Sequence, residues 1–227
     1  MNRTILLAVL LCVGCRLLTA RKPAGSAQVS VQPLGPAAVW NPSPRMLSAI
    51  REKCGRDPSS VDGCFLSQMQ QGGASPQALA FARACAENGL AYMRAFRKVG
   101  PVDIAYIEYA FRANELSGVL LVNGEPSIIN VDSEKFVSKE SFFRNPTFAV
   151  LAEKYPQISI WPGDRYQTGA PSVKHLESGG QSFEVDYVLR DGCHACAQIG
   201  AVSLTFTFDE QGKFRGIQAD NRSPAVN

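Results

Sequence analysis

The fold of this chain is decided largely by one stretch near its C-terminus, FEVDYVLRDGCHACAQIGAVSLTFTFDEQGKFRGI, at residues 183–217. It contains two runs in which apolar and polar residues alternate, 183–189 and 202–208. Because successive side chains of a β-strand point to opposite faces, a period of two predicts strands with one buried face. Between the runs lies Cys193-His194-Ala195-Cys196, where we look first for chemistry.

Composition predicts a globular protein with a substantial core. The chain has 227 residues, of which 45% are hydrophobic and 19% charged, and this is too apolar for a disordered protein. We expect one domain with a small helical part. The formal net charge of +3 falls by two, to +1, when Arg3 and Arg16 are removed with the N-terminal segment. So small a charge argues against electrostatic binding of nucleic acid.

Residues 1–20 are typical of an export signal. Arg3 precedes an apolar run at 5–13 that is too short to span a bilayer. Two processing routes stay open. A signal peptidase would cut after Ala20, whereas Cys12-Val13-Gly14-Cys15 resembles a bacterial lipobox, with Cys15 as the lipidation site, although Cys12 stands where leucine is usual. We therefore expect an exported protein that is periplasmic or lipid-anchored to the cell envelope.

Five cysteines lie beyond residue 20, and in an exported protein such cysteines are expected to form disulfides. Since five is odd, at least one is left without a partner in the chain. The sequence leaves the pairing open among Cys54, Cys64, Cys85, Cys193 and Cys196.

The first half of the chain is predicted to be a tether followed by helices. Residues 21–44 are rich in Pro and Ala and read as a flexible tether. Two helices are expected at about 45–53 and from 58 to Gly72. A third should run from the N-cap Ser75 to Gly100, because it has an apolar stripe of helical spacing at Leu79, Ala82, Ala86, Leu90, Met93 and Phe96. In the resulting helical hairpin, Cys64–Cys85 is our first disulfide candidate and Cys54–Cys64 its rival.

The second half is predicted to be mostly strands. We expect strands at 102–113, 119–122, 127–131 and 158–161 besides the two of the opening stretch, a helix over 141–155, and a long loop at 166–180. Asn123-Gly124 is a strong hairpin signal. The fold class is therefore α+β: an N-terminal helical hairpin, then a mostly antiparallel sheet of about five to six strands with one further helix. The expected domain is 45–220, helical over 45–100 and a sheet over 101–220, with a disordered tail at 221–227.

Cys193-His194-Ala195-Cys196 has four interpretations. A thioredoxin-like pair needs a helix after the cysteines, but a strand is expected there. Covalent haem attachment needs a histidine at Ala197, which excludes it. A metal site would have to combine these thiolates with His194 and a carboxylate such as Asp191, because no second cysteine pair exists and only His175 remains as a further histidine. A local disulfide closing the bend suits an exported protein best. His194 itself is read as a solvated or locally hydrogen-bonded imidazole, with a ligand or proton donor as the alternative.

Other catalytic signatures are weak or missing from the sequence. It contains no Gly-x-Ser-x-Gly elbow, phosphate loop, dinucleotide fingerprint or long apolar helix. Asp103 and Glu108 are the carboxylates to inspect, because their strand is apolar on both sides, although strand-end and ion-paired roles are the ordinary reading. Trp161 either lines a groove or packs in the core beside a turn.

We therefore expect a non-enzymatic exported bacterial protein that binds a protein or small-molecule partner. No catalytic residue and no cofactor are assigned, nucleic acid is not an expected partner, and contact with a membrane would come only through an N-terminal lipid. The alternative is thiol-redox or metal-handling activity through Cys193, His194 and Cys196.

Overall fold

The computed structural model describes residues 33–55, 59–86, 89–112, 116–133, 135–137, 146–162 and 171–219. The compact unit begins at Pro33. The export signal, the lipidation candidate Cys15, the cleavage position at Ala20 and the tail 221–227 lie outside the described residues. Within the described part of the chain, no helix is long and apolar enough to cross a membrane.

The first helices begin at the residues that the sequence indicates. Ser43 and Ser75 are N-caps whose hydroxyl groups accept hydrogen bonds from Met46 N and Ala78 N, and each is followed by proline. The helices are η1 (Pro36–Ala38), α1 (Pro44–Cys54), α2 (Val61–Gln71) and α3 (Pro76–Ala84).

The predicted tether extends too far along the chain. Ala38 and Trp40 are buried, and Trp40 N donates to Met93 O, so residues 33–44 belong to the folded unit. This stretch is predicted to be a tether because its apolar residues show no periodic spacing. It folds as a 3-10 turn and a single parallel bridge from Val39 to Met93, and neither of these imposes a periodic pattern on the sequence.

The third helix is also shorter than predicted. It ends at Ala84, and residues Ala91–Arg97 form strand β1 instead. The pairing of β1 shifts at a bulge between Met93 and Ala95, and a bulge adds one residue to the strand. Met93 and Phe96, three residues apart, therefore pack in the same cluster and imitate helical spacing.

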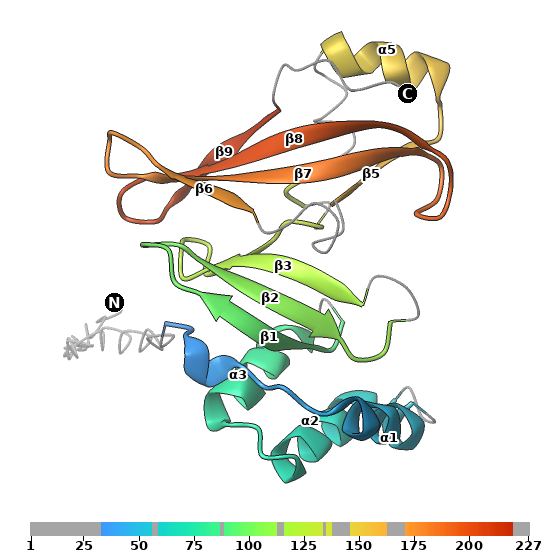
Figure 1. The fold of residues 1–227 in the computed structure, drawn as a ribbon, viewed down its shortest axis with the longest axis vertical. Coiled ribbons are helices and arrows are strands. Elements are labelled where there is room, and N and C mark those ends of the chain that lie inside the picture. The colour runs from blue at the N-terminus through green and yellow to red at the C-terminus, as the bar shows by residue number, and fades with distance from the viewer. Residues whose placement is uncertain are drawn as a thin grey trace, which may run out of the picture. The chain divides into compact units, whose positions relative to one another are not determined.

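The remaining elements form two antiparallel sheets (Figure 1). The first has the order β1-β2-β3-β4, and its β3–β4 turn is the predicted Asn123-Gly124 hairpin, with Asn123 at φ 70°. Its further strands are β2 (Asp103–Tyr109), β3 (Ser117–Val122) and β4 (Ile128–Asn130).

The second sheet has the order β5-β7-β8-β9, and β6 also pairs with β7. The strands are β5 (Ile158–Pro162), β6 (Ser172–His175), β7 (Gln181–Asp191), β8 (Gln198–Phe208) and β9 (Phe214–Ala219), and helix α5 (Pro146–Lys154) precedes them. The α+β class and the antiparallel pairing are confirmed, but the described strands number nine in two sheets rather than five to six in one. The difference arises because the sequence pattern predicts a helix at β1 and a loop at β6, and because β9 is a short edge strand that contains Gly216.

The first sheet is covered on both faces. Ile104, Leu121 and Ile129 pack in one cluster with inward-facing residues of β7 and β8 and with Phe148 of α5. The opposite face packs against α3 through Phe81. The two sheets therefore share a core, which aromatic residues such as Phe183 and Phe206 fill.

A buried amide joins the second sheet to the β1–β2 turn of the first. Gln181 opens β7 and is fully buried. Its Oε1 accepts from Val102 N at 2.8 Å, and its Nε2 donates to Val99 O at 2.9 Å. Gly100 lies between these partners, and a Cβ at this position would come within 2.5 Å of Gln181 Nε2. A non-glycine residue at position 100 would therefore collide with the amide.

Replacing Gln181 by leucine is expected to destabilise the fold, because the buried Val102 N–H and the partly buried Val99 C=O would both lose their partners. The cost is roughly 1–3 kcal/mol for each group left unpaired, measured as the free energy of unfolding in urea. Gln218→Leu, on the exposed side of β9, is the matched control and should change this free energy little. Equal effects of the two substitutions would contradict the assigned role of Gln181.

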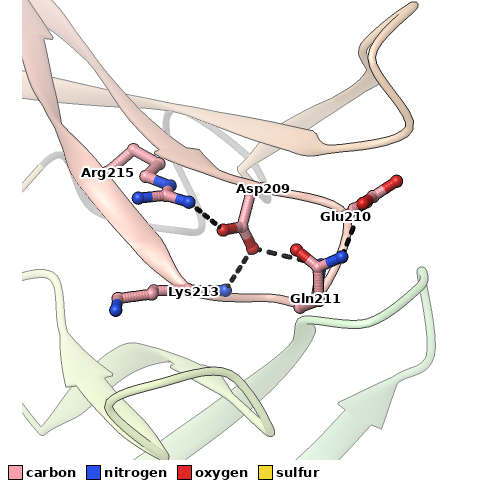
Figure 2. Close-up of polar contacts among 5 residues, drawn as sticks. All are labelled: Asp209, Glu210, Gln211, Lys213 and Arg215. Atoms are coloured by element: carbon pink, nitrogen blue, oxygen red, sulfur yellow. Dashed lines mark hydrogen bonds and ion pairs between the residues drawn. The ribbon is translucent and has the colours of Figure 1, made fainter.

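The β8–β9 turn is organised by one carboxylate, Asp209 (Figure 2). Its Oδ1 accepts from Gln211 N and Lys213 N, and its Oδ2 pairs with Arg215 at 2.5 Å. The same turn reaches the first sheet, because Glu125 N donates to Gly212 O and Phe214 N donates to Glu125 O, both at 2.9 Å. The hydrogen bond from Lys213 N and the Arg215 charge hold the pKa of Asp209 below its ordinary value of 3.8.

The Asp209 contacts predict a pH-dependent loss of stability. Because the pKa of Asp209 is lower in the folded state than in the unfolded chain, its carboxylate stabilises the folded state at pH values above 3.8. This contribution is lost as the pH falls from 3.8 through the pKa of the folded state. Asp209→Asn should therefore unfold at lower urea concentration than the wild type at neutral pH, and the gap should shrink as the pH falls below this value. Glu177→Gln, an exposed carboxylate in the β6–β7 turn, is the control. A gap that is independent of pH would contradict the assignment.

Candidate functional site at the disulfide-closed hairpin

Cys193-His194-Ala195-Cys196 forms the turn between β7 and β8. Cys193 and Cys196 are joined by a disulfide with their Cα atoms 5.0 Å apart, which is the local bridge expected from the sequence. Backbone hydrogen bonds close the turn independently, from Asp191 N to Ala197 O at 3.0 Å and from Cys196 N to Cys193 O at 2.9 Å. Gly192 has φ 102°, a left-handed conformation that favours glycine.

Two polar contacts join this turn to the sheet, and a third supports one of them. Arg190 Nη1 donates to Cys196 O at 2.8 Å, and Ser159 Oγ donates to Gly192 O. Trp161 Nε1 in turn donates to Ser159 Oγ at 2.7 Å. The side chains of β5 and β7 therefore hold the turn in one position relative to the sheet.

His194 packs on Trp161. Their rings meet edge to face with centroids 5.1 Å apart, and His194 is exposed while Trp161 is half-buried. Trp161 pairs with Val188, and Val188 pairs with Ala201, so all three lie on the face of the second sheet opposite the shared core. We use the name tip surface for the set of side chains gathered here: Ser159, Trp161, Val188, Arg190, His194 and Ala201.

The structure does not support a thioredoxin-like arrangement at this turn. Such pairs depend on a helix whose N-terminus stabilises the first thiolate, and here strand β8 begins at Gln198, two residues after Cys196.

The proposed metal ligands are not assembled into a site. Among the described residues, no group of three or more His, Cys, Asp or Glu side chains is placed to hold a metal ion. Both cysteines are in the disulfide, and metal ligation requires thiolates. His175 pairs with Gln181 at the start of β7, whereas the turn follows the other end of that strand.

Asp103 and Glu108 have structural roles and do not form a catalytic pair. Asp103 is buried, and its Oδ1 accepts from Val99 N at 2.8 Å while its Oδ2 accepts from Asn123 Nδ2 at 2.8 Å. Glu108 forms an ion pair with Arg94 at 2.8 Å. The two carboxylates are five residues apart on β2, so they point to opposite faces of the sheet.

The first disulfide candidate among the helical cysteines is wrong, and its rival is correct. Cys54 pairs with Cys64, with Cα atoms 5.5 Å apart, and Cys85 is a free, buried thiol. Cys85 is the C-cap of α3 and packs in a cluster with Phe81 of that helix and Met93 of β1, separate from the cluster of Cys54 and Cys64. Burial raises the pKa of Cys85 to about 12, so its thiol stays protonated at neutral pH.

Sequence reasoning missed most of the tip surface. Ser159, Arg190 and Val188 carry no motif of their own, and they meet only through the pairing of β5 with β7. The one available signal was the alternation of Ser159 and Trp161 with apolar neighbours in a short strand.

In comparisons with protein-family models, curated proteins and solved structures, nothing matches this chain. Its function is therefore argued from the site.

The cysteine pairing predicts a specific thiol count. In the processed, folded protein, an alkylating reagent at neutral pH should label no cysteine, since Cys85 is buried and protonated. In denaturant without reductant it should label Cys85 alone, as read by peptide mass spectrometry. Reduction in the presence of denaturant should expose all five cysteines. Labelling of Cys54 or Cys64 without reductant would contradict the pairing.

Proposed function

We propose that this chain is an exported bacterial binding or accessory domain without enzymatic activity, acting in the periplasm or at the cell envelope, and that it contacts its partner through the tip surface. The observation that carries the proposal is the Trp161–His194 pair, held at an exposed, disulfide-closed turn. The partner is a protein or a small molecule.

The tip surface has the physical properties of a recognition patch. Tryptophan and arginine are enriched among residues that dominate binding energy, because each combines a large contact area with polar groups. Trp161 has its indole N–H satisfied by Ser159, and Arg190 is fixed on Cys196 O. Side chains that are already ordered lose little conformational entropy when a partner binds.

Export is supported by the N-terminal sequence and by the cysteines. Arg3 and the apolar run 5–13 have the pattern of a signal peptide, and two disulfides suit an oxidising compartment. Residues 21–32, which precede the folded unit, have the composition of a linker between the envelope and that unit.

Processing can be tested directly by the intact mass of protein recovered from an exporting bacterium. We expect either a chain beginning at Arg21 or a chain beginning at a lipid-modified Cys15. Recovery of the full chain with Met1 from the cytoplasm would contradict export, and it would leave the tip surface open to the separate test below.

The binding role is tested by site-specific photo-cross-linking. A photoreactive phenylalanine analogue at position 194 should give discrete cross-linked products in cells, whereas the same analogue at Gln70, exposed on α2, should not. Each product is then identified and its purified partner titrated, and Trp161→Ala should weaken binding by about tenfold or more.

The control for this test is Lys174→Ala, which lies on β6 away from the turn and should leave the affinity unchanged. Equal cross-linking at positions 194 and 70, or an unchanged affinity in Trp161→Ala, would overturn the assignment of the tip surface.

A further inference from the structure

We propose that Cys193–Cys196 is an exchangeable disulfide that reacts with an external dithiol by attack at the Cys193 sulfur, with Cys196 leaving as the thiolate. The inference rests on the geometry of the turn and does not depend on the proposed binding role. It assigns a modification site and a chemical direction to a bridge that otherwise looks structural.

The cysteines of the two disulfides differ in their exposure to solvent. Cys193 is exposed, whereas Cys196 is only partly so. Cys54 of the other bridge is buried among the helices, in a cluster with Phe65 and Met69. Its partner Cys64 is partly exposed, as Cys196 is. Since exchange needs a thiolate to reach a disulfide sulfur, Cys193, the most exposed of the four bridged cysteines, is the one that we expect a reductant to attack first.

The surroundings of Cys196 favour it as the leaving group. Cys193 N donates to Cys196 Sγ at 3.1 Å, and a hydrogen bond to a thiolate is stronger than one to a neutral sulfur. Arg190 Nη1 is bound to Cys196 O at 2.8 Å, which brings a guanidinium charge to this residue. Negative charge that develops on Cys196 Sγ as the bond breaks is therefore stabilised.

The hairpin does not depend on the bridge for its closure. Three contacts that close the turn do not involve the S–S bond: Asp191 N to Ala197 O, Ser159 Oγ to Gly192 O, and Arg190 Nη1 to Cys196 O. The two cysteines are also only three residues apart, so the bridge constrains little of the unfolded chain. Reduction is therefore a local change at the turn that leaves the sheet folded.

The reaction balances as two exchange steps. The first thiolate of the dithiol forms a bond to Cys193 Sγ, and the Cys193–Cys196 bond breaks with its electron pair leaving on Cys196 Sγ. The second thiol of the dithiol, as thiolate, then attacks the first sulfur of the dithiol, which is bonded to Cys193 Sγ in the mixed disulfide. The bond between these two sulfurs breaks and Cys193 leaves as the thiolate. The dithiol becomes a disulfide, and its two protons pass through solvent to the two released cysteines.

The test uses glutathione as the probe on the processed, oxidised protein. Short exposures are stopped with N-ethylmaleimide, which traps the released thiol before it can reverse the step, and peptides are mapped by mass spectrometry. The expected product carries glutathione on Cys193 and maleimide on Cys196, in about tenfold excess over the reverse arrangement. Cys54 and Cys64 should remain disulfide-bonded over the same time.

Arg190→Gln tests the stabilisation of the leaving group. It should slow the reaction with glutathione by about threefold to tenfold, because the charge beside Cys196 is lost. Arg215→Gln, at the opposite end of the sheet, is the matched control and should react at the wild-type rate. Far-ultraviolet circular dichroism checks that both variants are folded. If Arg190→Gln does not fold, the mapping of glutathione on the wild-type protein still tests the proposal.

Three results would overturn the proposal. These are glutathione found equally on both sulfurs or chiefly on Cys196, reduction of Cys54–Cys64 at a rate equal to that of Cys193–Cys196, and loss of the folded spectrum when the Cys193–Cys196 bridge alone is reduced.

Discussion

The buried amide of Gln181 is the interaction on which the arrangement of the two sheets depends. It satisfies Val102 N–H and Val99 C=O in the β1–β2 turn from the first residue of β7. Asp103 holds the same turn from the other side and is linked through Asn123 to Leu34 N and O. Buried backbone groups are costly to leave unpaired, so this network specifies one relative position of the turns while the apolar core supplies the stabilising area.

The two disulfides serve different parts of the fold. Cys54–Cys64 ties α1 to α2, whose cluster with Trp40 and Phe65 is separate from the core shared by the sheets. Cys193–Cys196 closes a turn that is already hydrogen-bonded, at the exposed end of β7 and β8. A bridge in the first position stabilises a small helical layer, whereas one in the second presents its sulfur to solvent. This difference in exposure, and not the Cys-x-x-Cys spacing, is what makes the second bridge chemically accessible.

Much of the fold could be predicted from local patterns. The Ser43 and Ser75 caps, the Asn123-Gly124 hairpin and the alternating runs of β7 and β8 were all readable, because each depends on neighbours in the sequence. The errors arose where a local pattern had two meanings. The spacing of Met93 and Phe96 suits a helix, but a bulge in β1 gives a strand the same spacing on one face. Cys85 and Cys64 lie at similar distances along the sequence from the α2–α3 turn, as a bridge between them requires, but Cys85 packs against β1.

By itself, the sequence determined the α+β class, the helix starts and the Asn123-Gly124 hairpin, and it favoured a local disulfide at the Cys193–Cys196 turn. Only the tertiary structure decided that Cys54 pairs with Cys64, that the strands divide into two sheets, and that Asp103 is a structural carboxylate. It also brought Ser159, Trp161 and Arg190 together beside His194. The physical reason is the same in each case: strand register and helix orientation join residues far apart in the chain, and the local periodicity of a single sequence does not specify which distant segments will pair.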